Sequence, residues 1–225
     1  MTGKRCLPII TSELASAKEI VNAATDYGLY ELWLDYLEDW DDPELLEWIE
    51  SIGEKLICLF RRQNLESPTK QFEIRQQFQL KISKLPVYVD FDLNTQQEEL
   101  EGFERGNTKL ITSYHNYERT PSREDLDRLY ERMDKFQPTV VKFAAFCEKE
   151  RDALMLLEFL LDIRDRGPEV IVLGMGKFGL PVRIFGAEWG NYISFAPQDI
   201  AASSAPGQLT VTELNSIQAI LKKRS

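Results

Sequence analysis

The sequence predicts an α/β fold in a single domain spanning residues 1–225, with a (β/α)₈ barrel as the favoured architecture. Two observations support this. Short apolar runs recur eight times, and longer charged segments with helical spacing separate them. A length of 225 residues also suits one barrel of this kind. An open, doubly wound sheet has the same alternation, so periodicity alone leaves it as the alternative.

The eight apolar runs are rich in Val, Ile, Leu and aromatic residues, and most are continuous rather than strictly alternating. This pattern is typical of parallel strands that are buried on both faces. The predicted strands are Leu7–Ile10, Leu29–Leu34, Leu56–Phe60, Val87–Phe91, Leu110–Tyr114, Val140–Phe146, Val170–Leu173 and Tyr192–Ala196.

Helix-start signals mark several of the segments between these runs. Ser12 precedes the first helical pattern, and Asp42-Pro43 precedes the second, since proline is tolerated in a first turn. Ser122 begins the fifth, and Thr210 with Glu213 forms a capping box for the last. No linker, low-complexity tract or internal repeat divides the chain.

Composition and charge limit the classes of function. The chain is 43% hydrophobic and 28% charged, which excludes global disorder. Its 27 basic and 37 acidic residues give a net charge of −10, which argues against nucleic acid as a partner. No run approaches the roughly 20 apolar residues of a membrane span, and the apolar stretch near the N-terminus is too short for a signal peptide.

Cysteine and histidine usage predicts a metal-free protein in a reducing compartment. Cys6, Cys58 and Cys147 are odd in number and far apart, and the chain has one histidine. This combination disfavours a structural zinc site, and free thiols fit the cytoplasm. The sequence does not fix the oligomeric state; a homodimer is one of the states that it allows.

Lys142 is the first candidate for chemistry, because it interrupts the apolar run Val140–Phe146. A buried ammonium is costly, so we expect its pKa to fall and to leave a nucleophilic amine. The alternative is a lysine that extends to the barrel rim or pairs with a carboxylate.

His115, the single histidine, ends the preceding predicted strand. Functional side chains of a barrel gather at the C-terminal ends of its strands, so His115 and Lys142 are expected to face one cavity. An imine-forming lysine beside a proton-moving histidine is a known pairing. A lone histidine is, however, more often structural.

Three further segments carry weaker signals. Gly174–Gly179 formally matches the GxGxxG pattern, but Pro181 soon afterwards is expected to interrupt the helix that a nucleotide would need. These glycines are better explained by a tight turn after the seventh strand. The loop Ser203–Gln208 presents hydroxyl and amide groups suited to a polyol or carboxylate. Arg61 and Arg183 could clamp a carboxylate, although most arginines are surface charges.

Taken in order, these segments resemble type I 3-dehydroquinate dehydratase, the Schiff-base enzyme of the shikimate pathway. The resemblance covers nearly the whole chain. It is carried by the segments Glu31–Asp35, Phe60-Arg61, Ser113–Tyr117 with Thr120-Pro121, Val141–Ala144, Met175–Arg183, Gly190–Phe195 and Ser204–Gln208, the last of which reads SAPGQ.

The resemblance implies a (β/α)₈ barrel that dehydrates 3-dehydroquinate to 3-dehydroshikimate by syn elimination, without a metal or organic cofactor. It gives Lys142 the role of imine-forming lysine and His115 that of general acid and base. The positions that it implies for binding the carboxylate and hydroxyls of the small-molecule substrate are Glu31, Arg61, Arg183, Ser204 and Gln208.

The chain departs from the family pattern at several positions. Trp33 stands where the family usually has arginine. Alternation along the strand favours a position in the cavity with Glu31, where Arg61 or Arg62 would supply the missing charge. The alternative is a locally shifted strand in which Trp33 packs in the core. The glutamate that partners the histidine normally precedes two glycines; Glu66 is the nearest candidate and lacks them. Val182 and Asn191 each replace a usual serine. These changes leave the imine chemistry intact and bear on substrate affinity.

Three functions therefore compete. The first is an active dehydratase, and the second is a Schiff-base lyase or aldolase of altered specificity, favoured if Trp33 reshapes the cavity. The third is a non-catalytic barrel that acts as a binding protein. Retention of both Lys142 and His115 argues against the third, since a binding protein needs neither.

Overall fold

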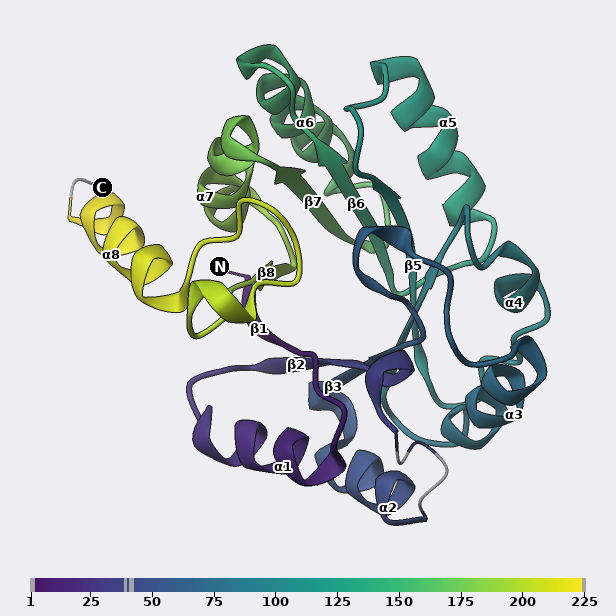
Figure 1. The fold of residues 1–225 in the computed structure, drawn as a ribbon. Helices are drawn as coiled ribbons and strands as arrows, with labels where there is room; N and C mark the ends of the chain where they lie inside the picture. Colours follow the sequence, from purple (N-terminus) through teal and green to yellow (C-terminus); the bar gives the residue numbers. More distant parts are fainter. Residues whose placement is uncertain (1–2, 39, 41–42, 224–225) are drawn as a thin grey trace.

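The computed structural model describes residues 3–38, 40 and 43–223, and it forms a (β/α)₈ barrel that is nearly closed. Figure 1 shows the strands at the centre with the helices around them. The strands are β1 Lys4–Ile9, β2 Leu29–Trp33, β3 Leu56–Leu59, β4 Tyr88–Asp92, β5 Lys109–Asn116, β6 Val140–Phe146, β7 Glu169–Met175 and β8 Ile193–Phe195. The helices are α1 Leu14–Ala23, α2 Pro43–Ile52, α3 Phe72–Ile82, α4 Gln97–Glu101, α5 Arg123–Asp134, α6 Glu150–Ile163, α7 Leu180–Trp189 and α8 Val211–Lys222.

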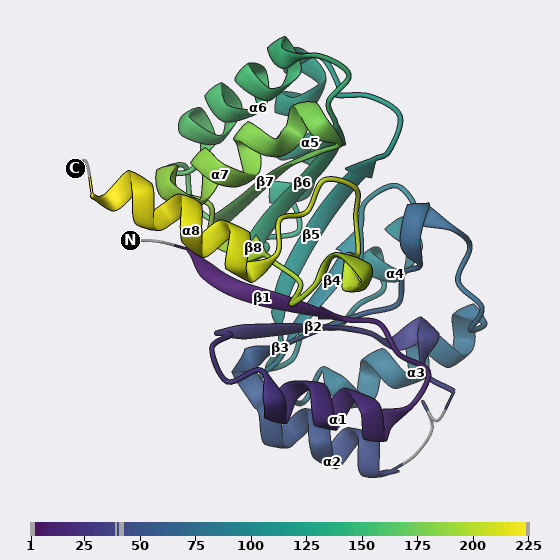
Figure 2. The same ribbon diagram turned by 60° about the vertical axis from the view of Figure 1, so that its left-hand side comes forward.

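All eight predicted strands are present, and every pair of neighbouring strands in the sheet is parallel. The order is β7-β6-β5-β4-β3-β2-β1-β8, so the first and last strands of the chain lie side by side. Figure 2 shows β1 and β8 together, beneath α8. The open-sheet alternative is thereby excluded.

β7 and β8 stand at the two ends of this order, and a side chain helps to join them. Asn191 Nδ2 donates to the Val172 carbonyl at 2.8 Å, and its Oδ1 accepts from the Val172 N–H at 2.7 Å. The Tyr192 N–H also donates to the Val170 carbonyl at 2.8 Å. The side-chain amide of Asn191 thus makes the two hydrogen bonds that the main chain of a neighbouring strand would make. It does so across the seam of the barrel, where β7 and β8 meet.

The helix-start predictions are mostly confirmed. Ser122 accepts a hydrogen bond from the Asp125 N–H at the start of α5, and Thr210 with Glu213 forms the expected capping box of α8. Pro43 is the first residue of α2, while Asp42 lies outside the described residues. α1 begins one residue later than expected, because Glu13 rather than Ser12 occupies its N-cap.

The floor of the barrel interior belongs to an apolar cluster to which every strand contributes. One residue of each strand forms the floor itself: Cys6, Leu29, Ile57, Tyr88, Ile111, Val140, Ile171 and Ile193. The other buried members of the cluster, Ala144, Leu173, Met175 and Phe195, line the cavity above it. Successive side chains of a strand point to opposite faces, so the residues two positions further along also face inward. Those positions form the next layer, towards the C-terminal ends of the strands, where barrel enzymes carry their active sites.

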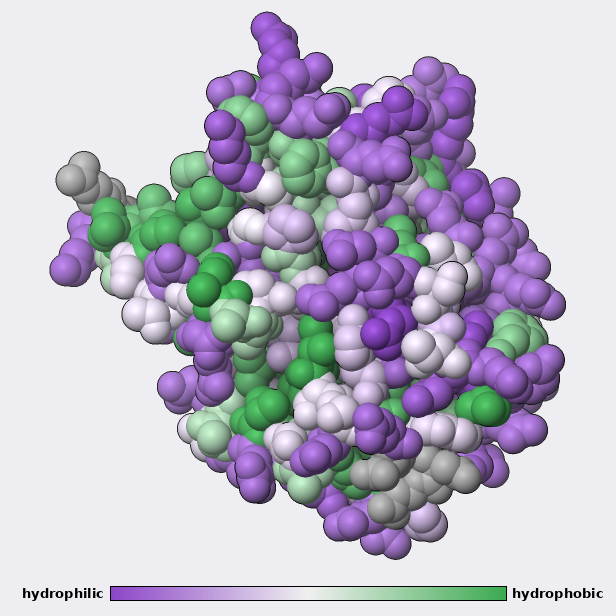
Figure 3. All heavy atoms as spheres, in the orientation of Figure 1, coloured by the Kyte–Doolittle hydropathy of each residue, from purple (hydrophilic) through white to green (hydrophobic). Residues whose placement is uncertain are grey.

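The face of the molecule seen in Figure 3 is mostly polar. Figure 3 shows hydrophilic side chains over most of one face, with apolar side chains gathered over α8. Among the described residues, no helix combines the length and the apolar character needed to cross a bilayer.

Candidate active site

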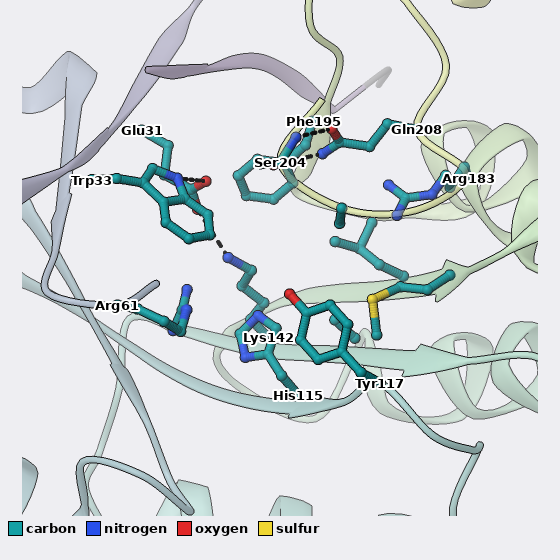
Figure 4. Close-up of a pocket in the computed structure, with 14 residues that line it drawn as sticks. Glu31, Trp33, Arg61, His115, Tyr117, Lys142, Arg183, Phe195, Ser204 and Gln208 are labelled. Atoms are coloured by element: carbon teal, nitrogen blue, oxygen red, sulfur yellow. Dashed lines mark hydrogen bonds and ion pairs between the residues drawn. The ribbon is translucent and has the colours of Figure 1, made fainter. Parts of the chain in front are cut away.

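A small cavity lies above the apolar floor, at the C-terminal ends of the strands. Alternation along the strands explains what lines it: Glu31 follows Leu29 by two residues on β2, and Lys142 follows Val140 on β6. Figure 4 shows these side chains converging. The predicted site residues that line the cavity are Glu31, Arg61, His115, Lys142, Arg183, Ser204 and Gln208.

Lys142 is held between two carboxylates. Its Nζ donates to Glu31 Oε1 at 3.0 Å and to Asp90 Oδ2 at 3.1 Å, and it lies 4.5 Å from the centre of the Phe195 ring. The lysine is 5% exposed, so the alternative of an extension to the rim is excluded. The alternative of pairing with carboxylates is correct, and it places Lys142 at the centre of the cavity.

The expectation that the pKa of Lys142 falls is wrong. Burial lowers this pKa, but Asp90 and Glu31 raise it by more, so the net shift is upwards. The resting amine is therefore an ammonium. A nucleophilic role requires that a proton leave Nζ first, and among the described residues Glu31 and Asp90 accept hydrogen bonds from it.

Arg61 supports the same arrangement from the end of β3. Its guanidinium forms a two-pronged pair with Asp90, at 3.2 and 3.0 Å, and donates to Ser113 Oγ at 3.1 Å. The positive charges of Arg61 and Lys142 hold the pKa of Asp90 far below its ordinary value despite the burial of the carboxyl group. Asp90 is thus ionised and bridges the two cations.

His115 takes its partner from β4 rather than from the loop after β3. Its Nδ1 lies 2.9 Å from Asp92 Oδ2, and both residues are buried. The prediction that Glu66 partners the histidine is wrong. Glu66 follows the short helical turn Gln63–Leu65, its side chain is 60% exposed, and its ion-pair partner is Arg62, at 3.7 Å.

The His115 ring is neutral at neutral pH. Burial and the positive charge of Arg61 lower its pKa, and the raising effect of Asp92 does not fully offset them. A neutral imidazole that lines the cavity can accept a proton, which is the property that general base catalysis needs.

Arg183 lies in the first turn of α7 and is 7% exposed. Its Nη2 donates to the Pro206 carbonyl at 3.4 Å, and its Nε has no hydrogen-bond partner among the described residues. Burial lowers its pKa to about 10. A buried guanidinium without a carboxylate partner favours an anionic ligand at this end of the cavity.

The loop after β8 presents the hydroxyl and the amide that the sequence predicted. Gln208 Nε2 donates to Ser204 Oγ at 2.9 Å, and Gln208 Oε1 accepts from the Ser204 N–H at 2.8 Å. The Ser204 hydroxyl accepts from Gln208 through its oxygen and can donate its hydrogen to a ligand in the cavity.

A second loop meets this one at the mouth of the cavity. Gln63, in the loop after β3, donates through Nε2 to the Ser203 carbonyl at 3.2 Å. Two residues near these partners line the cavity: Arg61, two positions before Gln63, and Ser204, which follows Ser203.

Trp33 faces the cavity, as alternation along β2 predicts. Its indole is 4% exposed, and its Nε1 donates to Glu31 Oε2 at 2.9 Å. Arg61 lies with its guanidinium carbon 5.8 Å from the ring centre, so it brings a positive charge beside the indole. Arg62 instead pairs with Asp35 at 3.2 Å, outside the cavity.

The glycines of Gly174–Gly179 serve a tight turn, as expected. Gly176 has φ 72°, and a Cβ there would come within 2.8 Å of the Phe146 ring. The expected interruption at Pro181 is wrong, because proline is tolerated in the first turn of α7. Val182 is buried, and Asn191 serves the barrel seam instead of the cavity wall.

Sequence reasoning missed three polar residues of the site. Asp90 and Asp92 are two positions apart at the end of β4, and Tyr117 lines the cavity after β5. The signal for the first two was available: an Asp-Phe-Asp triplet that ends an apolar strand places two carboxylates on the inward face.

A model of a known family matches residues 5–225, and its description is type I 3-dehydroquinase. The chain belongs to the type I 3-dehydroquinase family. The family is one of hydro-lyases, and its model covers all eight strands apart from the first residue of β1.

Individual relatives agree with the family match. The chain is 32% identical over 218 residues to 3-dehydroquinate dehydratase of Coxiella burnetii, covering 92% of this chain and 89% of that one. It is 29% identical over 219 residues to the enzyme of the same name from Methanothermobacter thermautotrophicus, covering 94% of each chain.

Solved structures support the fold. The 3-dehydroquinate dehydratase of Geobacillus kaustophilus superposes with a TM-score of 0.83 at 21% identity, covering 99% of this chain and 92% of that one. The type I enzyme of Clostridium difficile, solved with covalently modified comenic acid, has a TM-score of 0.85 at 24% identity, covering 100% and 94% of the two chains.

Proposed function

We propose that this chain is a 3-dehydroquinate dehydratase that works through an imine on Lys142. The observation that carries the proposal is the convergence of a buried lysine, a neutral histidine and an unpaired buried arginine in one cavity. Membership of the type I 3-dehydroquinase family supports the substrate. Three buried, unpaired cysteines support a site of action in the reducing cytoplasm.

Arg183 binds the substrate carboxylate in this proposal. Among the described residues no carboxylate pairs with its guanidinium, and its Nε has no hydrogen-bond partner there, so the substrate carboxylate supplies the counter-charge. The Ser204 hydroxyl and the Gln208 amide lie in the same lining and bind the hydroxyl groups. This arrangement leaves the ring ketone to face Lys142.

Imine formation begins with loss of a proton from Lys142 to Glu31, because Asp90 is held ionised by Arg61 and Lys142 and is a poor acceptor. The free amine then attacks the ketone carbon, and water leaves as the C=N bond forms. The iminium withdraws electrons from the adjacent carbon, so a C–H proton there becomes acidic.

His115 accepts this proton and returns a proton to the departing hydroxyl group, so a second water is lost. Hydrolysis of the imine consumes one water and frees the amine and the product. The net change is the loss of one water from the substrate, and no electrons enter or leave the site.

Borohydride trapping tests the proposal directly. Reduction in the presence of 3-dehydroquinate should add a ligand mass to one peptide, the one that contains Lys142, and Lys142→Met should abolish both the adduct and turnover. The exposed Lys177 offers a matched control, since Lys177→Met should keep the adduct. No adduct in the wild-type protein at saturating substrate would overturn the proposal.

Trp33 favours one alternative, a Schiff-base lyase of altered specificity, because it replaces a cation at the cavity wall with an indole. The same trapping experiment separates the two. An adduct at Lys142 without release of 3-dehydroshikimate indicates altered specificity, whereas an adduct with product release supports the dehydratase.

A further inference from the structure

The carboxylate of Asp92 contacts both the main chain and the ring of His115. Asp92 Oδ2 accepts from the main-chain N–H of His115 at 3.1 Å and lies 2.9 Å from Nδ1 of the ring. One buried oxygen therefore bonds to both the backbone and the side chain of the same residue. This fixes the ring relative to β5.

The other oxygen of Asp92 is engaged by the loop after β4. Oδ1 accepts from the N–H groups of Asn94 and Thr95, at 3.2 and 3.1 Å, and from Thr95 Oγ1 at 3.0 Å. Burial raises the pKa of Asp92, but His115, Arg61 and Thr95 lower it by more. The carboxylate is ionised and can only accept hydrogen bonds, so the hydrogen of a neutral His115 ring must be on Nδ1.

We propose that Asp92 is the positioning residue of the reaction: it holds His115 as the Nδ1–H tautomer and leaves Nε2 as the proton acceptor in the cavity. The inference rests on the proposed function. It assigns to β4 the support that the family resemblance assigns to a glutamate in the loop after β3.

The loop after β3 is unsuited to that support here. Asn64 and Leu65 have φ values of 55° and 57°, a backbone conformation that side chains rarely adopt, and Glu66 points to solvent. The loop thus has a left-handed backbone at Asn64 and Leu65, neither of which is glycine. The Glu66 carboxylate is directed away from the His115 ring.

Charged groups on several strands set the pKa of the His115 ring, and Asp92 is one of them. Arg61 from β3 and Lys142 from β6 lower the pKa of His115, and Asp92 from β4 raises it. The Asp90 carboxylate also interacts with the His115 ring through its charge. Glu31 and Tyr117 line the same cavity as the ring. Removal of the Asp92 charge should therefore lower the pKa of His115.

The tautomer can be measured without turnover. The chain has one histidine, so long-range ¹H–¹⁵N correlation spectra of untagged, ¹⁵N-histidine-labelled protein report His115 alone. We expect a protonated Nδ1 and an unprotonated Nε2 at neutral pH. An Nε2–H ring in the wild-type protein would overturn the proposal, whether or not any variant folds.

The Asp92→Asn variant tests whether Asp92 positions the His115 ring or only stabilises the fold. We expect kcat to fall by about 10² or more, because the amide can turn its NH₂ towards Nδ1 and reverse the tautomer. The borohydride adduct at Lys142 should persist, and the acid limb of the kcat profile should move to lower pH. A fall in kcat with an unchanged tautomer and an unmoved acid limb would overturn the proposal.

Asp35→Asn is the matched control. Asp35 is also a buried carboxylate that accepts from loop N–H groups, those of Thr69 and Lys70, but it lies outside the cavity. Its loss should lower stability and leave the tautomer of His115 unchanged. The two proposals fail differently: a wild-type protein without the Lys142 adduct refutes the imine reaction, whereas the tautomer measurement still tests Asp92.

Discussion

Trp33 and Lys142 bind the two oxygens of a single carboxylate, that of Glu31. The indole Nε1 donates to Oε2 at 2.9 Å, and Lys142 Nζ donates to Oε1 at 3.0 Å. The indole therefore orients Glu31 towards the lysine, a role that its packing in the cavity wall alone would not give it.

Trp33→Arg restores the residue that the family resemblance expects, and we predict a folded protein with equal or higher kcat/KM. An arginine also donates to Glu31, and it adds a cation for the substrate hydroxyls. Circular dichroism and steady-state kinetics check this. An unfolded or aggregated variant would mean that the indole is needed for packing.

Trp33→Phe serves as its control, because it keeps an aromatic ring and removes the donor. Loss of a hydrogen bond to a charged group should lower the free energy of unfolding by about 1.5–3 kcal/mol. Unchanged stability would show that the contact between Trp33 and Glu31 is energetically neutral.

Arg183→Met should raise the stability of the free protein while it weakens substrate binding. The guanidinium is buried and has no carboxylate partner in the described part of the chain, so replacing it with an apolar side chain should raise the free energy of unfolding by about 1 kcal/mol or more. KM should rise by about one to two decades, because a two-pronged contact with the carboxylate is lost.

Arg62→Met is the matched control, because Arg62 is ion-paired with Asp35 outside the cavity. This variant should lose stability rather than gain it. Urea denaturation and initial-rate kinetics measure both effects. Equal losses of stability in the two variants would contradict the assignment of Arg183 as an unpaired anion-binding group.

The lowered pKa of Asp35 leads us to expect a loss of stability in acid. Burial raises its pKa, but hydrogen bonds from Thr69, Lys70 and Arg62 lower it by more, so the folded-state pKa lies below that of the unfolded chain. Its contribution is thus complete above the unfolded-state pKa of about 3.9 and is lost as pH falls through the folded-state value.

The free energy of unfolding of Asp35→Asn should therefore fall less steeply than that of the wild type below about pH 5. The difference in slope is at most about 1.4 kcal/mol per pH unit for one proton. Urea unfolding between pH 3 and pH 7 measures it. Parallel curves would show that Asp35 has the same pKa in both states.

Asn191→Ser replaces the seam residue with the serine that the family resemblance expects at this position. Serine is too short to bond both the N–H and the carbonyl of Val172, so we expect a loss of about 1–3 kcal/mol for each main-chain group left unpaired. Because Asn191 does not line the cavity, KM should stay within about twofold of wild type. A change in KM with unaltered stability would instead place this position in substrate binding.

The strands and most of the site follow from the sequence because local patterns determine them. Apolar runs identify all eight strands, and Lys142 is conspicuous because nothing else charged interrupts Val140–Phe146. Alternation with Glu31 places Trp33 in the cavity. These inferences use neighbours along one strand only.

What the sequence could not provide depends on neighbours across strands. The pKa of Lys142 rises because Glu31 and Asp90 approach from two other strands, and a lysine considered alone predicts the opposite direction. For the same reason, the hydrogen-bond partner of His115 is Asp92 on the adjacent strand and not the glutamate that was expected from a loop. Register between strands decides both, and a single strand does not contain that information.

The hydrogen bond from Gln63 to the Ser203 carbonyl has a consequence for how the cavity meets its ligand. It joins the loop after β3 to the loop after β8, and Arg61 and Ser204, which lie within two residues of the two partners, both line the cavity. The spacing between these two parts of the lining is therefore set before a ligand arrives. Less of the binding free energy is then spent on ordering the two loops.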